Sequence, residues 1–340
     1  MNVLRCRYKG LRTLFLLLAV CSGVSISQAS INELNLDLSQ TSVSGLSSGG
    51  YMATQFQLSH SQTIIGAGIV GAGPYYCALG DIGTALRQCV NKVSSTINNQ
   101  AFLEKYKEYL SLGLVAPSAA LQDDRVKLIH GKDDGTVNRK ASDMLARQYR
   151  AWLSAQNFDY VSDKDFAHHM PTISAGNACD VSASPFLGDC DYDAAGEILS
   201  FIYSELSPPT TNQILKVDTI NIAELANLEG TSINENAFIF VPKACKTGES
   251  CKLHISFHGC NQSADDIGKV YAEQAGYNRW ADVNNMVVLY PQVKKSMFMP
   301  LNPQGCWDWW GYTDENYANK NGPQVNAIYK VMQALAKGNR

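Results

Sequence analysis

The strongest chemical motif in this sequence is the segment Gly45–Gly49, which has the form G-x-S-x-G. Small and β-branched residues precede it, and Tyr51–Leu58, a segment compatible with a helix, follows it. Glycines permit a sharp turn from a strand into a helix, which leaves the serine oxygen exposed. Ser47 is therefore a candidate nucleophile, and the backbone N–H of Ser48 is a candidate donor to an oxyanion. A plain glycine-rich turn at a helix start is the alternative interpretation.

A serine nucleophile needs a base and a group that orients the base. Asp134 follows the apolar segment Arg125–His130, so it is expected at the carboxyl edge of a sheet, where α/β proteins build their sites. His168 lies in a loop after a possible strand and completes the order Ser…Asp…His that α/β-hydrolases use. Asp133 and His169 stand beside these two residues, and residue chemistry does not choose between the neighbours. A solvated Asp-Gly turn and a surface or metal-binding histidine pair are the alternatives.

The chain has 340 residues, of which 45% are hydrophobic and 17% are charged, as in a globular protein. Residues 1–29 carry four basic side chains and no acid, so 24 basic residues face 31 acidic ones in the remainder. This balance argues against a nucleic-acid partner, which requires a basic face. It also argues against a polybasic membrane anchor.

Residues 1–29 have the pattern of a secretory signal peptide. Basic residues precede an apolar run, Leu14–Val20, and small residues follow it, so cleavage is expected after Ala29. The run is shorter than the ~20 residues that a membrane-spanning helix needs. A lipoprotein signal ending at Cys21 fits poorly because a valine precedes the cysteine. We therefore expect a secreted or periplasmic protein without a membrane anchor.

Eight cysteines lie outside the leader, and an even number in an exported chain favours disulfides. About a hundred pairings are possible, so the sequence alone does not fix them. Proximity along the chain favours Cys77–Cys89, Cys179–Cys190 and Cys245–Cys251, which leaves Cys260–Cys306 as one long link. Zinc is the alternative, but no C-x-x-C pair is present.

Predicted strands alternate with predicted helices along the chain, which indicates an α/β fold with a mostly parallel central sheet flanked by helices. The expected strands are Thr41–Gly45, Ile64–Val70, Arg125–His130, Tyr160–Val161, Ala237–Val241, Leu253–Phe257 and Met286–Tyr290, and the expected helices are Tyr51–Leu58, Lys140–Leu153, Ala194–Leu206 and Gln324–Lys337. Ser207–Asn212 is the clearest linker. His254 and His258 fall in or beside a predicted strand and are interpreted as structural residues.

These motifs resemble the poly(3-hydroxybutyrate) depolymerases, in particular their single-domain, circularly permuted type. The resemblance extends from about Ser42 to the carboxyl terminus. It is carried by Ser44–Ala53, Gly73–Tyr75 with Cys77, Gly131 with Asp134 and Val137, His168 with Pro171, His258–Ser263, Gly276–Ala281, Leu289–Gln292 and Gly305–Trp309. It implies an α/β-hydrolase fold in which the His258-Gly259 segment, which precedes the serine turn in ordinary esterases, follows it. Residues 30–340 would be a single catalytic domain with the original ends joined near 207–215.

The resemblance implies a role for each site residue. Ser47 would be the nucleophile, Asp134 the orienting acid and His168 the base. The N–H groups of Ser48 and Cys260 would form the oxyanion hole. Trp307, Trp309 and Trp310 would line the substrate crevice, although plain packing is as good an interpretation of tryptophans there. No metal or organic cofactor is implied.

The function implied is hydrolysis of poly(3-hydroxybutyrate) or its oligomers to 3-hydroxybutyrate units through an acyl-enzyme. An esterase acting on soluble short-chain or plant acyl esters is the neighbouring alternative. A non-catalytic polymer-binding protein on a hydrolase scaffold is a third, which the presence of all three triad residue types disfavours. The sequence gives no indication of the oligomeric state.

Overall fold

The structure is a computed structural model, and it describes residues 34–90 and 97–337. These residues belong to one unit within Ile31–Arg340. The predicted signal peptide, residues 1–29, lies outside the described residues. None of the helices formed by the described residues combines the length and the apolar character that crossing a membrane requires.

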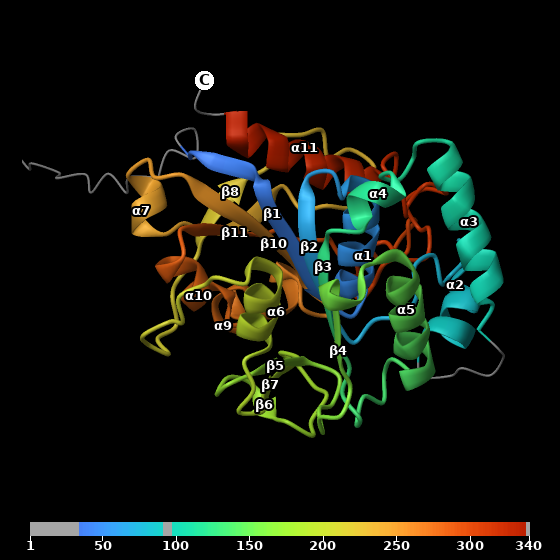
Figure 1. The fold of residues 1–340 in the computed structure, drawn as a ribbon, viewed down its shortest axis with the longest axis horizontal. Coiled ribbons are helices and arrows are strands. Elements are labelled where there is room, and N and C mark those ends of the chain that lie inside the picture. The colour runs from blue at the N-terminus through green and yellow to red at the C-terminus, as the bar shows by residue number, and fades with distance from the viewer. Residues whose placement is uncertain (1–33, 91–96, 338–340) are drawn as a thin grey trace, which may run out of the picture. The chain divides into compact units, whose positions relative to one another are not determined.

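Eight strands form the central sheet in the order β4-β3-β2-β1-β10-β11-β9-β8 (Figure 1). Their bounds are β1 Leu36–Leu46, β2 Ile64–Val70, β3 Arg125–Ile129, β4 Phe158–Val161, β8 Asp218–Asn221, β9 Asn236–Phe240, β10 Cys251–Phe257 and β11 Met286–Tyr290. Only the pairs β11–β9 and β8–β9 are antiparallel among the described strands. The predicted α/β fold with a mostly parallel sheet is confirmed.

Both faces of the sheet are covered, as the apolar composition of its central strands requires. Val287 and Leu289 of β11 belong to one buried cluster with residues of α1, α5 and α11. Met286 and Val288 point to the other face and pack with residues of α6, α9 and α10. The helices are α1 Ser48–His60, α5 Arg139–Trp152, α11 Pro323–Lys337, α6 Ala194–Tyr203, α9 Val270–Gln274 and α10 Tyr277–Val283 (Figure 1).

Several elements were not predicted from the sequence. They are the helices α2 Ile82–Thr84, α3 Asn99–Ser111, α4 Ser118–Leu121, α7 Lys243–Lys246, α8 Ala264–Ile267, α9 and α10, the short helical turns Ala85–Cys89 and Ala155–Asn157, strand β8, and a second sheet of β5 Met170–Thr172, β7 Leu187–Asp189 and β6 Asn177–Ala178. Helix α6 ends at Tyr203, three residues before the predicted end. Ser204 adopts a left-handed conformation there, and two prolines follow shortly after it.

The strand order is that of a circularly permuted α/β-hydrolase. Counted from the β8 edge, the strands are β8, β9, β11 and β10, followed by β1, β2, β3 and β4. A chain that began at β8 would therefore place its strands as 1-2-4-3-5-6-7-8, with β10 ahead of the serine turn. Residues 204–217, which include the predicted join, form neither helix nor strand. The topology thus agrees with the permutation that the sequence resemblance implies.

Asp124, a carboxyl in the core beside α1, makes the stability of this fold dependent on pH. Its side chain accepts a hydrogen bond from Gln57 Nε2 at 2.9 Å, and burial raises its pKa from 3.8 to about 8. The unfolded chain releases this proton at a lower pH than the folded protein does. The free energy of unfolding therefore falls as pH rises from 3.8 towards 8, by up to about 1.4 kcal/mol per pH unit.

We expect an Asp124→Asn variant to gain about 3–4 kcal/mol of stability relative to the wild type when pH is raised from 5 to 8. The asparagine oxygen accepts the same Gln57 hydrogen bond but has no proton to release. Denaturant unfolding of both proteins at the two pH values, with disulfides intact, measures this change. The contributions of all other titrating groups cancel when the free energies of unfolding of the two proteins are subtracted at each pH. Equal stability differences at pH 5 and pH 8 would contradict the raised pKa.

Candidate active site

Ser47 occupies a tight turn between β1 and α1. Its backbone lies at φ 56° and ψ −121°, which is uncommon for a residue other than glycine. The Ser47 N–H donates to Val70 O at 2.8 Å. A Cβ on Gly45 would lie 2.2 Å from Gly49 O, and one on Gly49 would lie 2.2 Å from Phe257 O. Only glycines therefore fit on either side of the serine, as the G-x-S-x-G pattern predicts.

Asp134 and His168 form a hydrogen-bonded pair at the carboxyl edge of the same sheet. Asp134 follows β3, its side chain is 2% exposed, and its Oδ2 accepts from His168 Nδ1 at 2.8 Å. Its Oδ1 accepts the backbone N–H groups of Thr136 and Val137. Burial on its own would raise the pKa of the Asp134 carboxyl. The charges and hydrogen bonds around it, those of His168 foremost, outweigh burial and hold the pKa below its ordinary value.

The neighbouring residues, Asp133 and His169, are not part of this pair. Asp133 is exposed on the loop. His169 is buried, and its Nε2 donates to Cys179 O at 2.8 Å. The structure thus distinguishes Asp134 from Asp133 and His168 from His169, which residue chemistry alone left equivalent.

Two further residues shape the surroundings of Asp134. His130 Nδ1 lies 3.7 Å from Asp134 Oδ2 and 3.0 Å from Ser142 Oγ, and burial lowers the pKa of His130. Gly71 has φ +56°, and a Cβ there would lie 3.1 Å from both Asp134 Oδ2 and His168 Nδ1. Sequence reasoning missed both residues. The i, i+4 spacing of His130 and Asp134 was the only available signal.

A pocket of about 420 Å³ opens over this edge of the sheet, and Ser47 and His168 both line it. The tryptophans Trp309 and Trp310 and the ring of Tyr51 form part of its wall. The Trp309 and Tyr51 rings stack with their centroids 4.5 Å apart. The pocket therefore combines a hydroxyl, an imidazole held by a carboxylate and an aromatic wall.

The two predicted oxyanion donors come from different elements near the carboxyl ends of β1 and β10. Ser48 is the first residue of α1, whose first N–H groups have no acceptor within the helix. Cys260 follows β10, the strand beside β1, and lines the pocket. The Cys260–Cys306 disulfide and the Asn261 N–H donating to Gln304 O at 2.7 Å tie this loop to residues 302–306. This placement suits the predicted role, which remains a prediction.

The prediction that Trp307 contacts the substrate is wrong for this structure. Its side chain is fully buried, it does not line the pocket, and its ring packs against Phe257 with centroids 4.9 Å apart. Trp309 does line the pocket, together with Trp310. Their loop is organised by Asp308, whose buried carboxylate accepts several backbone N–H groups, those of Trp310, Gly311, Tyr312 and Thr313.

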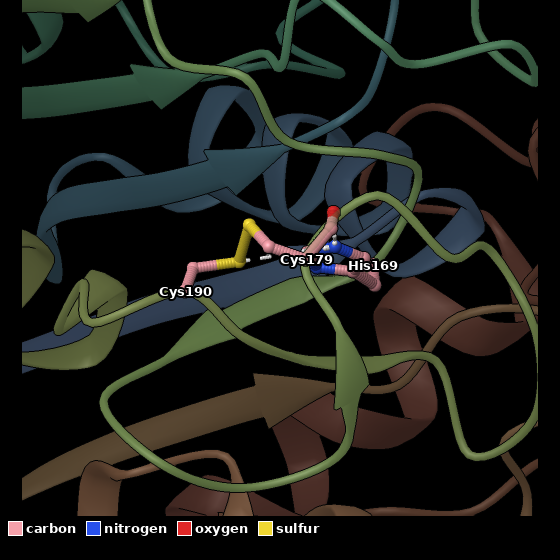
Figure 2. A group of neighbouring side chains, drawn as sticks. All are labelled: His169, Cys179 and Cys190. Atoms are coloured by element: carbon pink, nitrogen blue, oxygen red, sulfur yellow. Dashed lines mark hydrogen bonds between the residues drawn. A yellow bond between two sulfur atoms is a disulfide. The ribbon is translucent and has the colours of Figure 1, made fainter.

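The described residues form four disulfides: the three pairs that proximity favoured, Cys77–Cys89, Cys179–Cys190 and Cys245–Cys251, and the pair that these left over, Cys260–Cys306. Figure 2 shows that His169 faces one of them, Cys179–Cys190. The three side chains are close enough to surround a metal ion, but a disulfide has no thiolate to offer one. The group is therefore a histidine packed on a disulfide rather than a metal site.

The strand order and the serine turn define this protein as an α/β-hydrolase. No protein-family model matches the sequence. The chain is 36% identical over 326 residues to a poly(3-hydroxybutyrate) depolymerase from Delftia acidovorans, covering 94% of this chain and 65% of that relative. It is 30% identical over 334 residues to a polyhydroxybutyrate depolymerase from Talaromyces funiculosus, covering 94% of this chain and 96% of that relative.

Solved structures give the same result. A polyhydroxybutyrate depolymerase from Penicillium funiculosum superimposes with a TM-score of 0.83 at 30% identity, over 90% of this chain and 98% of that one. A serine-to-alanine depolymerase variant complexed with an R3HB trimer matches with the same TM-score, identity and coverage. This chain belongs to the polyhydroxybutyrate depolymerase family, whose members are carboxylic-ester hydrolases.

Proposed function

We propose that this protein is an exported serine esterase that hydrolyses poly(3-hydroxybutyrate) or its oligomers to 3-hydroxybutyrate units. The observation that carries the proposal is that Ser47 and His168 line the same pocket. Asp134 Oδ2 accepts a hydrogen bond from His168 Nδ1 at 2.8 Å and so holds the imidazole in place. The relative complexed with an R3HB trimer carries a serine-to-alanine substitution, which fits a serine as the reacting group.

The mechanism follows from the positions of these groups. Asp134 accepts a hydrogen bond from the Nδ1–H of His168, which leaves Nε2 unprotonated and able to take the proton of Ser47 as the serine oxygen attacks the ester carbonyl. The N–H groups of Ser48 and Cys260 stabilise the tetrahedral intermediate, and each such donor contributes about 3 kcal/mol. His168 then protonates the leaving alcohol. Water, activated by the same histidine, releases the 3-hydroxyacid from the acyl-enzyme.

Two observations support export. Residues 1–29 have the composition of a signal peptide, and the described residues contain four disulfides. Disulfides persist outside the cytoplasm. We propose cleavage after Ala29, with residues 30–340 as one catalytic domain joined internally near 207–215.

Exposed apolar side chains favour a polymer surface over a soluble ester as the substrate. Met297, Phe298 and Met299 are 71%, 84% and 88% exposed, on the segment that precedes the pocket-lining residues Gln304 and Cys306. Ile82 and Leu86, also exposed, line the pocket itself. The chain spans about two thirds of the Delftia relative. The exposed apolar side chains named above are available for adsorption to a polyester.

The decisive experiment measures 3-hydroxybutyrate released from a poly(3-hydroxybutyrate) suspension by the mature protein, with the Ser47→Ala variant as the blank. Release by the wild type alone supports both the substrate and the nucleophile. Hydrolysis of p-nitrophenyl butyrate without release from the polymer would replace the polymer by a soluble ester. Failure with both substrates would favour a non-catalytic binding protein.

We expect a Phe298→Ser/Met299→Ser variant to adsorb to polymer about tenfold more weakly while hydrolysing p-nitrophenyl butyrate within twofold of the wild-type rate. Complete burial of one large apolar side chain contributes about 1.5–3 kcal/mol to the free energy of adsorption. A rough polymer surface covers each side chain only in part, so the expected loss is smaller. Depletion of protein from solution by polymer granules measures adsorption. Leu112→Ser is the control, since Leu112 is 63% exposed and does not line the pocket. Equal weakening in both variants would contradict the assignment.

A further inference from the structure

Gln262 is a buried glutamine whose side chain joins two loops that both line the candidate pocket. It is 1% exposed and lies two residues after Cys260. Its Oε1 accepts the Gly259 N–H at 2.7 Å, and its Nε2 donates to Pro185 O at 2.8 Å and Phe186 O at 3.0 Å. One acceptor and both donors of the amide are therefore used, and the amide fits in one orientation only.

The first loop carries the proposed oxyanion donor Cys260. The Gly259 carbonyl and the Cys260 N–H belong to one planar peptide unit and point in opposite directions. His258 Nδ1 donates to Gly259 O at 2.7 Å, and its Nε2 accepts the Val293 N–H at 3.3 Å. Burial lowers the pKa of His258 to about 4, so this histidine is neutral at pH 7. Gln262 thus holds the N–H of Gly259 and His258 holds its carbonyl. Together they fix the peptide unit that contains the Cys260 N–H and therefore the direction of that N–H.

The second loop carries part of the pocket wall. Phe186 and Ser182 both line the pocket. Ser182 Oγ donates to His168 O at 3.1 Å, and Phe186 O also accepts the Met170 N–H at 3.0 Å. The Ser182–Phe186 loop is therefore hydrogen-bonded to the backbone of His168, the candidate base, and to the backbone of Met170. Its position relative to Gly259 depends on the Gln262 amide.

We infer that Gln262 is a positioning residue that sets the spacing between the oxyanion loop and the Ser182–Phe186 wall of the pocket. Its oxygen maintains the direction of the Cys260 N–H and so supports kcat. Its nitrogen maintains the wall against which the acyl chain lies and so determines KM for extended substrates. This inference rests on the proposed esterase function.

Two substitutions distinguish the contribution of the Gln262 amide oxygen from that of its nitrogen. In Gln262→Glu a carboxylate still accepts the Gly259 N–H but cannot donate to Pro185 O or Phe186 O. In Gln262→Met all three hydrogen bonds are absent at nearly the same side-chain volume. We expect Gln262→Met to lose about 10–100-fold in kcat on p-nitrophenyl butyrate, as for a misplaced oxyanion donor. We expect Gln262→Glu to keep kcat within about threefold while KM for a 3-hydroxybutyrate trimer rises about tenfold.

The matched control is Gln148→Met. Gln148 is also 1% exposed and also bridges through its amide, accepting the Tyr75 N–H and donating to Asn99 Oδ1. Neither of these partners lines the pocket, whereas Gly259 and Phe186, the partners of Gln262, both do. It should lose stability in denaturant unfolding and keep both kcat and KM. If Gln262→Met and Gln148→Met lose kcat alike, Gln262 has only a structural role and the inference is overturned.

The remaining outcomes are equally decisive. If Gln262→Glu loses as much kcat as Gln262→Met, the division of roles between oxygen and nitrogen is wrong. If Gln262→Met does not fold, Gln262→Glu decides alone, and an unchanged KM for the trimer overturns the inference. A wild type without Ser47-dependent hydrolysis overturns the proposed function and this inference with it. An active wild type with unaffected Gln262 variants overturns the inference only.

Discussion

A His168→Ala variant is expected to lose about 10⁶-fold in kcat, a Ser47→Ala variant the same amount, and the double variant no more than either. Both residues line one pocket, and in the proposed mechanism the serine reacts only while the histidine takes its proton. Removing either partner therefore abolishes the same step. Hydrolysis of p-nitrophenyl butyrate at high enzyme concentration measures all three variants above the background reaction. A further drop in the double variant would contradict a shared step.

The adjacent histidine provides the control for this prediction. His169→Gln keeps a donor for Cys179 O, and the imidazole that it removes faces the Cys179–Cys190 disulfide rather than Asp134. We expect kcat to stay within about tenfold of the wild type, with some loss of stability. The opposite result, an inactive His169→Gln and an active His168→Ala, would exchange the roles of the two histidines.

The sequence was sufficient to predict those features that depend on short stretches of chain. The core strands are apolar runs, and β2 and β11 begin and end at the predicted residues. The serine turn could be predicted because its two glycines are required by the backbone itself. The strand order could be predicted only through resemblance, because nothing in the residues alone states which strand pairs with which.

The tryptophans illustrate what local patterns do not contain. Trp307, Trp309 and Trp310 lie within four residues, yet the first is in the core and the others line the pocket. The loop has no regular period that would assign faces. Its path is set by Asp308, a buried carboxylate that gathers successive N–H groups. Which tryptophan faces the pocket is therefore a property of the folded loop.

Gly71 and Gln262 could not be predicted for a different reason. A side chain on Gly71 would meet Asp134 and His168, and Gln262 bonds to carbonyls 76 and 77 residues away. Each requirement arises where segments distant in sequence come together. Residue chemistry alone likewise does not choose His168 over His169; the resemblance made that choice, and in the structure the two imidazoles point to different partners.

An Asp134→Asn variant is expected to lose about 10⁴-fold in kcat, although the site should change little in shape. Asp134 Oδ1 accepts two backbone N–H groups, those of Thr136 and Val137. In the variant the amide oxygen stays with these donors, so the NH₂ group takes the place of Oδ2 opposite His168 Nδ1. Nδ1 must then accept, which moves the imidazole proton to Nε2. A protonated Nε2 cannot take the proton of Ser47, and the imidazolium also loses its counter-charge.

The matched control is Asp133→Asn, which removes one carboxylate from the same exposed loop. Its kcat should remain within about twofold of the wild type, because the Asp133 side chain is exposed and Asp133 does not line the pocket. Because the pKa of Asp134 lies below its ordinary value, the wild-type carboxyl is ionised at pH 6–9 and the deficit of Asp134→Asn should be nearly constant there. Rates of p-nitrophenyl butyrate hydrolysis across that range test this. A variant that keeps a tenth or more of the wild-type kcat would show that Asp134 does not orient the base, and the acid would have to be sought elsewhere along this edge of the sheet.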